Sequence, residues 1–301
     1  MRKPFTQALL EASACPDFVF LTGDLGFMAL EPLRDAIGDR FINAGVAEQN
    51  MIGVAAGLAR TGLRPWAYSI GPFIYARPFE QIRNDVCLHN LPVVLVGNGG
   101  GYGYGVQGGT HHSLEDYGIL LCLPNMRVFV PAFDSDLAPI TRRLMTAQHP
   151  AYLRLGLSEQ PAWLAPQAFA QWRRVLPGRG PTVACVGPLV GGVIDAIRIA
   201  GLDADVWLVS ELPLGQLPAE FLASVSNSGY LLAIEEHVAA GGFGQMLAHA
   251  LLTAGAAPKR FVHRSALGLV SGLFGSQAFH RAECGLDPAS IVAELTRTAN
   301  K

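Results

Sequence analysis

Short apolar runs alternate with longer helical patterns through the first half of the chain. The predicted strands cover residues 18–21, 65–70, 92–97, 128–132 and 151–155. Continuously apolar strands separated by helices are typical of a parallel sheet that is buried on both faces. The pattern therefore predicts an α/β domain in this half.

The alternation stops after Leu155 and resumes near residue 182. Between Ser158 and Gly180 the periodicity is lost and prolines and glycines accumulate, which predicts a linker. Strands are then expected at residues 182–187, 206–210, 230–235 and 260–264, with helical patterns at 195–200 and 244–254. A second, smaller α/β domain with a mostly parallel sheet follows from this pattern.

Composition narrows the class of protein. The 301 residues suffice for two domains, and only 15% are charged, so we expect another protein to cover much of the surface in an oligomer. No Lys/Arg run is longer than a pair and no apolar run reaches 18 residues, which excludes a nucleic-acid footprint and a membrane span. Residues 1–11 do not fit a signal peptide, so a cytoplasmic protein is expected. The five cysteines lack Cys-x-x-Cys spacing and predict free thiols without a metal site.

Glu48 lies in the first turns of a predicted helix that is rich in small residues. An exposed carboxylate here would interact favourably with the helix dipole, by roughly 0.3–1 kcal/mol. Alternatively, Glu48 is buried and hydrogen-bonds a ring nitrogen of a bound partner, which would make its burial tolerable. The spacing leaves both interpretations open.

A glycine-rich loop follows the strand at residues 92–97 and ends in His111 and His112. Eight of the 13 residues from 97 to 109 are glycine, an entropically costly composition that usually accompanies a ligand at the carboxyl end of a parallel strand. A dinucleotide site is a weak alternative, because no helix pattern opens after the loop. Adjacent histidines seldom bind one metal ion, so a neutral histidine that exchanges protons is favoured.

Three further polar positions lie in or beside predicted strands. Asp24 follows the first strand, where it either caps a simple turn or faces a ligand. Arg154 lies inside an apolar strand and needs an anion, from either a structural salt bridge or a substrate. The acid pair in Glu235-Glu236-His237 precedes a glycine-rich turn at 241–244 and suggests a strand-end function or an intersubunit contact.

Taken in order, these segments resemble the C-terminal half of transketolases and of their relatives, the deoxyxylulose-phosphate synthases and the β subunits of 2-oxo acid dehydrogenases. The most specific matches are residues 41–50, 77–85, 109–112, 123–126, 235–237 and 241–244. The resemblance implies a thiamine diphosphate pyrimidine-binding domain at 1–160, a linker at 161–177 and a transketolase C-terminal domain at 178–301.

The resemblance also implies roles for individual residues. Glu48 would bond the cofactor's aminopyrimidine and favour the tautomer that removes the thiazolium proton, so that a two-carbon ketol unit passes from a ketose donor to an aldehyde acceptor. His111 would be the second catalytic residue and would contact substrate. The remaining positions are Asp24, Phe73 or its neighbour Ile74, and Arg77 at the cofactor, and Gln107 and Arg154 at the substrate.

One family element is missing from the sequence. The family binds the cofactor's diphosphate through Mg²⁺ held by a Gly-Asp-Gly motif, and Gly23-Asp24-Leu25 is not that motif. The expected assembly is therefore an α₂β₂ enzyme in which an N-terminal subunit carries the motif and the metal, and this chain binds none.

Two departures leave the substrate open. Gln107 and Gly99 replace an acidic residue and a histidine that touch sugar hydroxyls in full-length transketolases, so poor use of ordinary pentose phosphates is expected. The alternatives are a 2-oxo acid dehydrogenase β subunit, a deoxyxylulose-phosphate synthase-like enzyme and a non-catalytic regulatory paralogue.

Overall fold

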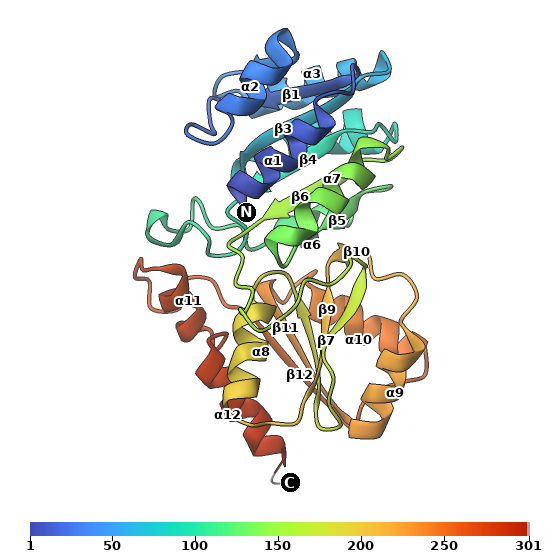
Figure 1. The fold of residues 1–301 in the computed structure, drawn as a ribbon, viewed down its shortest axis with the longest axis vertical. Coiled ribbons are helices and arrows are strands. Elements are labelled where there is room, and N and C mark those ends of the chain that lie inside the picture. Colours follow the sequence, from blue (N-terminus) through green and yellow to red (C-terminus); the bar gives the residue numbers. More distant parts are fainter. Residues whose placement is uncertain (300–301) are drawn as a thin grey trace.

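Two helix-flanked sheets follow one another along the long axis of the molecule (Figure 1). The computed structural model describes residues 1–299. The first sheet has seven strands and the second has five, and both are mostly parallel. This confirms the expected α/β class.

The first sheet has the strand order β10-β5-β6-β4-β3-β1-β2, and only β10 runs antiparallel to its neighbour. The sequence pattern missed β2, a three-residue edge strand that is too short to show a periodicity. The elements are α1 (Arg2–Ala12), β1 (Phe18–Thr22), α2 (Glu31–Ile37), η1 (Gly38–Arg40), β2 (Phe41–Asn43), α3 (Glu48–Arg60), β3 (Arg64–Ile70), α4 (Gly71–Tyr75), α5 (Phe79–Gln81), η2 (Ile82–Cys87), β4 (Val94–Asn98), η3 (Gly105–Gln107), α6 (Asp116–Leu120), β5 (Arg127–Phe129), η4 (Asp134–Asp136), α7 (Leu137–Met145) and β6 (Ala151–Leu155).

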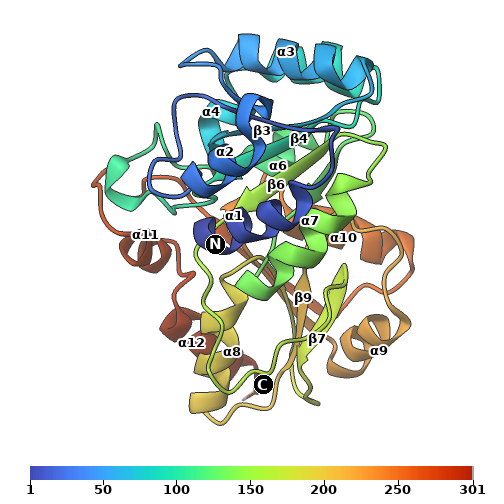
Figure 2. The same cartoon turned by 45° about the horizontal axis from the view of Figure 1, so that its top comes forward.

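Both faces of this sheet are buried, as its apolar strands predict. Along β1, Phe18 and Phe20 belong to the core cluster that contains residues of α1, α2 and α7, whereas Val19 and Leu21 belong to the cluster of α3. Helix α3 lies at the outer end of the molecule, away from the second domain (Figure 2).

The second sheet has the order β12-β11-β8-β9-β7. Strand β7 runs antiparallel to β9 and falls inside the predicted linker at 161–177. Its two arginines interrupt the apolar pattern, so the strand was not predicted. Arg173 can be buried because its guanidinium donates two hydrogen bonds to the Asp136 carboxylate, at 2.6 and 2.8 Å. The elements are β7 (Trp172–Leu176), β8 (Thr182–Val186), α8 (Val190–Ile199), β9 (Asp205–Val209), β10 (Glu211–Leu212), α9 (Ala219–Ser228), β11 (Tyr230–Val238), α10 (Phe243–Thr253), β12 (Arg260–Ala266), α11 (Gln277–Glu283) and α12 (Pro288–Ala299).

The two domains share strands and core. Strand β10 follows β9 in the chain but pairs with β5 of the first sheet. One hydrophobic cluster also runs from the first sheet into the second, through residues such as Val128 and Trp207. The chain itself therefore fixes the orientation of its domains. Among residues 1–299, no helix combines the length and apolarity that a membrane crossing requires.

Candidate functional site

The carboxyl edge of β1 and β2 forms a tight polar turn. The Oδ1 atom of Asn43 accepts the N–H groups of Asp24 and Gly45, each at 3.0 Å, and the Asn43 amide donates to the Asp24 carboxylate at 3.0 Å. Asp24 has a φ of 59° and an exposed side chain. The Asp24 carboxylate is thus bound by Asn43 at the end of the neighbouring strand and does not cap its own backbone.

Glu48 begins α3 directly beside this turn. Its side chain is only 4% exposed, so the interpretation of an exposed first-turn acid is wrong. A Cβ atom added to Gly23 would lie 3.3 Å from the Gly45 carbonyl and 3.9 Å from the Glu48 carboxylate. Glycine at position 23 therefore avoids a tight contact with the Gly45 carbonyl in the turn that precedes Glu48.

Arg77 is the cation that faces Glu48. Its Nη1 atom donates to both carboxylate oxygens, at 2.9 and 3.0 Å, and its guanidinium carbon lies 3.8 Å from the centroid of the Phe73 ring. The Arg77 side chain is 44% exposed, so solvent reaches the pair from one side. A flat cation thus rests between an aromatic ring and a buried carboxylate.

Phe73 extends the site toward the glycine-rich loop. Its ring meets the His111 ring edge-on, with centroids 5.2 Å apart, and the Tyr104 ring also meets His111 edge-on, with centroids 5.7 Å apart. The neighbouring Ile74 is fully buried in the core. Of the two residues that the resemblance left open, only Phe73 presents its side chain to the site.

Four predicted residues therefore form one connected row, from Glu48 through Arg77 and Phe73 to His111, with Asp24 adjoining at the Glu48 end. The row draws on α3, α4 and the glycine-rich loop, all at the carboxyl edge of the first sheet, where ligands bind in open α/β folds. Ser69 lies at the same edge; its buried hydroxyl has no hydrogen-bond partner among the described residues and would lie 4.0 Å from a Cβ on Gly23. The unpartnered Ser69 hydroxyl and the buried Glu48 carboxylate could therefore both hydrogen-bond a polar ligand at this edge.

Gln107 and Arg154 lie outside this row. Gln107 is exposed in the short helix η3. Arg154 is buried on β6, where its Nε donates to Asp116 at 2.7 Å and its Nη2 to the carbonyls of Ser113 and Glu236 at 2.7 and 2.9 Å. Burial lowers the pKa of Arg154, but Asp116 and the neighbouring tyrosines raise it further, so the pKa rises above its ordinary value. This geometry supports the structural salt bridge, and the substrate contact that the resemblance implied for Arg154 stays a prediction.

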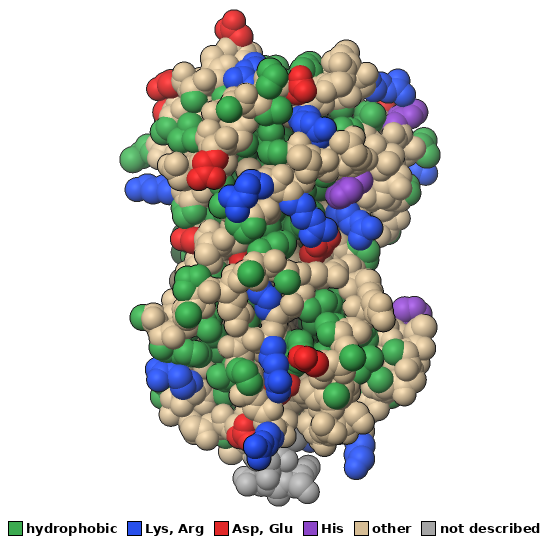
Figure 3. Space-filling view, turned by 45° about the vertical axis from the view of Figure 1, so that its right-hand side comes forward, with side chains coloured by type: hydrophobic (Ala, Val, Ile, Leu, Met, Phe, Trp, Pro, Cys, Tyr) green, Lys and Arg blue, Asp and Glu red, His purple; other side chains and the backbone are tan. Residues whose placement is uncertain are grey.

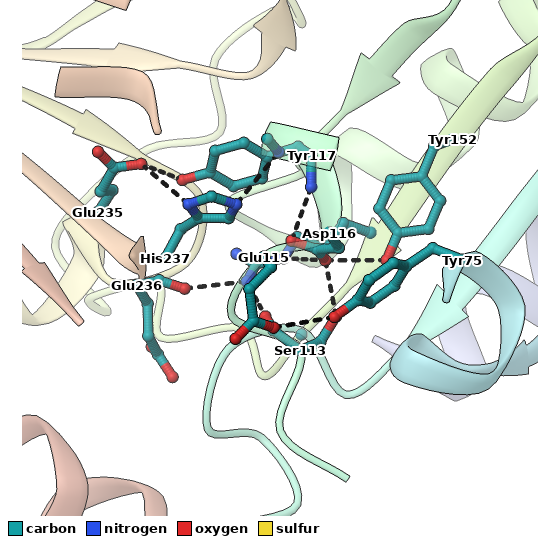
Figure 4. A network of polar contacts seen from close by, with 12 residues as sticks. Tyr75, Ser113, Glu115, Asp116, Tyr117, Tyr152, Glu235, Glu236 and His237 are labelled. Atoms are coloured by element: carbon teal, nitrogen blue, oxygen red, sulfur yellow. Dashed lines mark hydrogen bonds and ion pairs between the residues drawn. The ribbon is translucent and has the colours of Figure 1, made fainter. Parts of the chain in front are cut away.

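The carboxylate of Asp116 lies at the centre of a buried polar network between the domains (Figure 4). It accepts the hydroxyls of Ser113 and Tyr152 at 2.8 and 2.9 Å, in addition to Arg154. The network continues into the second domain through Tyr117, whose hydroxyl donates to Glu235. Its polar groups are thus committed to one another.

A basic cavity that sequence reasoning missed opens beside the glycine-rich loop. It has a volume of about 430 Å³ and is lined by Arg2 and Lys3 together with Asn98, Tyr104 and loop glycines. Burial raises the pKa of the Tyr104 hydroxyl, while the amide of Asn98, which donates to it at 2.7 Å, and Arg2 both lower it. The only available signal was the pair of cations at the start of α1, because the fold is what brings them to the end of β4.

The described residues contain no group of three or more His, Cys, Asp or Glu side chains arranged to hold a metal ion. His111 and His112 diverge: Thr110 bonds the Nδ1 atom of His111 at 2.9 Å, whereas His112 is buried and donates from Nε2 to the Gly105 carbonyl at 2.8 Å. The five cysteines are unbridged.

Fold and site together define a two-domain α/β protein whose binding edge lies on the first sheet. Residues 1–160 match the family model of the transketolase pyrimidine-binding domain, so the chain belongs to the transketolase family. It is 29% identical to one subunit of the apulose-4-phosphate transketolase of Actinobacillus succinogenes, covering 87% of this chain and 86% of that protein. It is 32% identical to the 1-deoxy-D-xylulose-5-phosphate synthase of Thermomicrobium roseum, covering 96% of this chain but 47% of that protein.

The structure is also similar to a solved one, described as a split gene transketolase in an inactive β4 tetramer. The TM-score is 0.82 at 28% identity, over 99% of this chain and 97% of that chain. These comparisons confirm the resemblance to the C-terminal subunit of a split transketolase.

Proposed function

We propose that the chain is the C-terminal subunit of a two-component enzyme that moves a two-carbon ketol unit from a ketose donor to an aldehyde acceptor with thiamine diphosphate. The observation that carries the proposal is the row of Glu48, Arg77, Phe73 and His111 at the carboxyl edge of the first sheet. Family membership supports the cofactor.

The residues of the row fit an aminopyrimidine. Phe73 offers a flat apolar face, and Glu48 offers a buried carboxylate that hydrogen-bonds a planar nitrogen group, as its contact with the Arg77 guanidinium illustrates. The orphaned Ser69 hydroxyl adds an unused donor. Asp24 lies in the adjoining turn, where Asn43 bonds its backbone N–H and its carboxylate.

When bound, the cofactor supplies a nucleophilic carbon and an electron sink for carbon–carbon bond cleavage. Glu48 exchanges a proton with a ring nitrogen, and its burial keeps water away from that hydrogen bond. Without the cofactor, Arg77 balances the charge of Glu48. When the aminopyrimidine binds, the Arg77 guanidinium would move out from between Glu48 and Phe73. His111 donates or accepts a proton at a hydroxyl or carbonyl of the substrate.

The basic cavity is the proposed place for an anionic group on the substrate. Arg2 and Lys3 supply two cations within one cavity, and Tyr104 joins that cavity to His111. Arg154 is less suited to this purpose, because its Nε and Nη2 atoms already make three internal hydrogen bonds. The proposed substrates are therefore phosphorylated or otherwise anionic sugars, in line with the substrate named for the Actinobacillus relative.

A partner subunit completes the proposed site. It would carry the Gly-Asp-Gly motif and Mg²⁺ for the diphosphate, in an α₂β₂ assembly. Large apolar side chains surround the carboxyl edge in this chain: Phe27 is 70% exposed, Met28 91% and Val46 75%. Apolar side chains also spread between sparse charges on the face shown in Figure 3. Such surfaces are typical of a chain that is covered in its assembly.

Cofactor binding with and without the partner tests this proposal. The N-terminal subunit would be identified by co-purification and mass spectrometry, and thiamine diphosphate with Mg²⁺ would be titrated calorimetrically. We expect at least 100-fold tighter binding by the complex, about 2.7 kcal/mol, because the diphosphate anchor lies on the partner. Equal affinity of the isolated chain would contradict the two-component site.

The substrate class is tested on the same complex. A ketose phosphate with an aldehyde should give a two-carbon transfer product, whereas product formation from pyruvate with an aldehyde would favour the synthase-like alternative suggested by the Thermomicrobium relative.

A further inference from the structure

The motif Glu235-Glu236-His237 at the end of β11 has no part in the proposed chemistry. All three side chains are buried where the second domain meets the first. Figure 4 shows them opposite the segment Ser113–Tyr117. This segment directly follows His111 and His112, so the motif faces the base of the glycine-rich loop.

Glu236 binds the beginning of that loop. Its Oε1 atom accepts the backbone N–H of Tyr102 at 2.7 Å, and the same carboxylate is held by Gln277 at 2.8 Å and Arg281 at 2.7 Å, both from α11. A Cβ atom on Gly101 would lie 2.5 Å from the Glu236 carboxylate, and Gly101 has a φ of 66°. Glycine at this position permits the close approach.

Glu236 also holds the end of the loop, through Arg154. The Glu236 carbonyl accepts Arg154 Nη2 at 2.9 Å, and the same nitrogen donates to the Ser113 carbonyl at 2.7 Å. Gly101 and Ser113 exchange two backbone hydrogen bonds of 2.9 Å, which close the neck of the loop. Glu236 of the second domain thus holds both sides of the neck. His111 belongs to the loop that this neck closes.

The second domain supports the underside of the loop as well. The Tyr102 hydroxyl donates to the Gly268 carbonyl at 2.8 Å, and its ring stacks on His280 of α11 with centroids 5.0 Å apart. His280 in turn meets the ring of His112 at 4.9 Å. The neighbour of His111 in the chain, His112, therefore packs against a residue of the second domain.

We propose that Glu236 is a positioning residue: the second domain uses its carboxylate and carbonyl to fix the loop that presents His111. The effect on catalysis rests on the proposed function, whereas the anchoring of the loop is a property of this chain alone. The C-terminal domain thereby sets the geometry of a site to which it contributes no reacting group.

The test compares Glu236→Ala and Glu236→Gln with the control Glu159→Gln. Glu159 is the other carboxylate on Arg281 but has no hydrogen bond to the loop. In the isolated chain we expect amide hydrogen exchange over residues 101–113 to accelerate at least tenfold in Glu236→Ala and less in Glu236→Gln. Exchange in β8 should not change, and the control should match the wild type.

In the assembled enzyme, Glu236→Ala should lower kcat at least tenfold while the affinity for thiamine diphosphate stays constant, because the cofactor contacts lie on the Glu48 side. If Glu236→Ala fails to fold, the same exchange and kcat measurements are made on Glu236→Gln and on Gly101→Ala, which strains the neck from the loop side.

Unchanged exchange over 101–113 in these variants would overturn the anchoring. Faster exchange with an unchanged kcat would overturn the positioning of His111. If the wild-type complex shows no two-carbon transfer, the proposed function fails, and the exchange measurement still decides whether Glu236 anchors the loop.

Discussion

The carboxyl edges of the two sheets carry similar residue types in opposite circumstances. At the first edge, Asp24 is exposed and the one cation on Glu48 is open to solvent. At the second edge, Glu235 and His237 are completely buried beneath the first domain. An acid and a histidine at strand ends therefore do not mark a reactive site by themselves. What distinguishes the two edges is how many donors each carboxylate already holds.

Glu235 is saturated by internal donors. It accepts the N–H groups of Phe243 and Gly244 at the start of α10, at 2.7 and 2.8 Å, and His263 at 2.6 Å, in addition to the Tyr117 hydroxyl. A carboxylate at a helix N-terminus is stabilised by the backbone dipoles. Glu48, in contrast, has a single side-chain partner that can leave.

Glu48→Gln should produce the largest catalytic effect and so test the first edge. Gln keeps the shape but cannot exchange a proton, so kcat of the assembled enzyme should fall by about 10²–10⁴. The free energy of unfolding of the isolated chain should change by less than about 1 kcal/mol, because the Arg77 side chain is 44% exposed and solvent screens the ion pair. Near-normal turnover would reduce Glu48 to a structural acid and remove the contrast between the edges.

Glu235→Gln should show the reverse pattern. Removing a buried charge that collects four donors should lower the free energy of unfolding by about 2–4 kcal/mol. Turnover per folded complex should fall much less than in Glu48→Gln. Urea denaturation of the isolated chain gives the first quantity. Glu220→Gln, an exposed acid in the first turn of α9, is the matched control and should stay within about 0.5 kcal/mol. A strong loss of turnover without a loss of stability would show that Glu235 takes part in chemistry.

The framework behind this contrast could be predicted from the sequence, but the contrast itself could not. Continuous apolar runs located most of the strands, and the glycine-rich loop was correctly expected at the carboxyl end of β4. Local patterns also singled out Glu48 and His111. They succeed because strand burial and loop composition are encoded by neighbouring residues.

Contacts between distant segments could not be predicted in the same way. Arg154 was ambiguous because Asp116, Ser113 and Glu236 surround it only after folding. The basic cavity joins Arg2 to Tyr104 across about a hundred positions of the chain. The pattern also placed the helix start at residue 195, whereas α8 begins at Val190, because Gly191 and Gly192 weaken the helical signal.

The smallest expected effect is a pH dependence of stability that arises at the second edge. His237 accepts the Gly118 N–H at its Nε2 atom, at 3.1 Å, so its proton resides on Nδ1 and is donated to the Val238 carbonyl at 2.7 Å. Burial lowers the pKa of His237, and Arg154 lowers it further, against the opposing influence of Asp116 and Glu235. The folded protein therefore holds this ring neutral at pH values where the unfolded chain, with a histidine pKa of about 6.5, already binds a proton.

The stabilisation by neutral His237 is complete above about pH 6.5 and is lost as the pH falls from there toward the lowered pKa of the folded state. The loss approaches about 1.4 kcal/mol per pH unit. Urea denaturation between pH 7.5 and 5.5 should show this decline in the wild type and a flatter one in His237→Gln. Some slope should remain, because burial lowers the pKa of His112 as well. An identical slope in the variant would mean that His237 binds its second proton equally well in the folded and unfolded states. The second edge would then not exclude solvent as its contacts indicate.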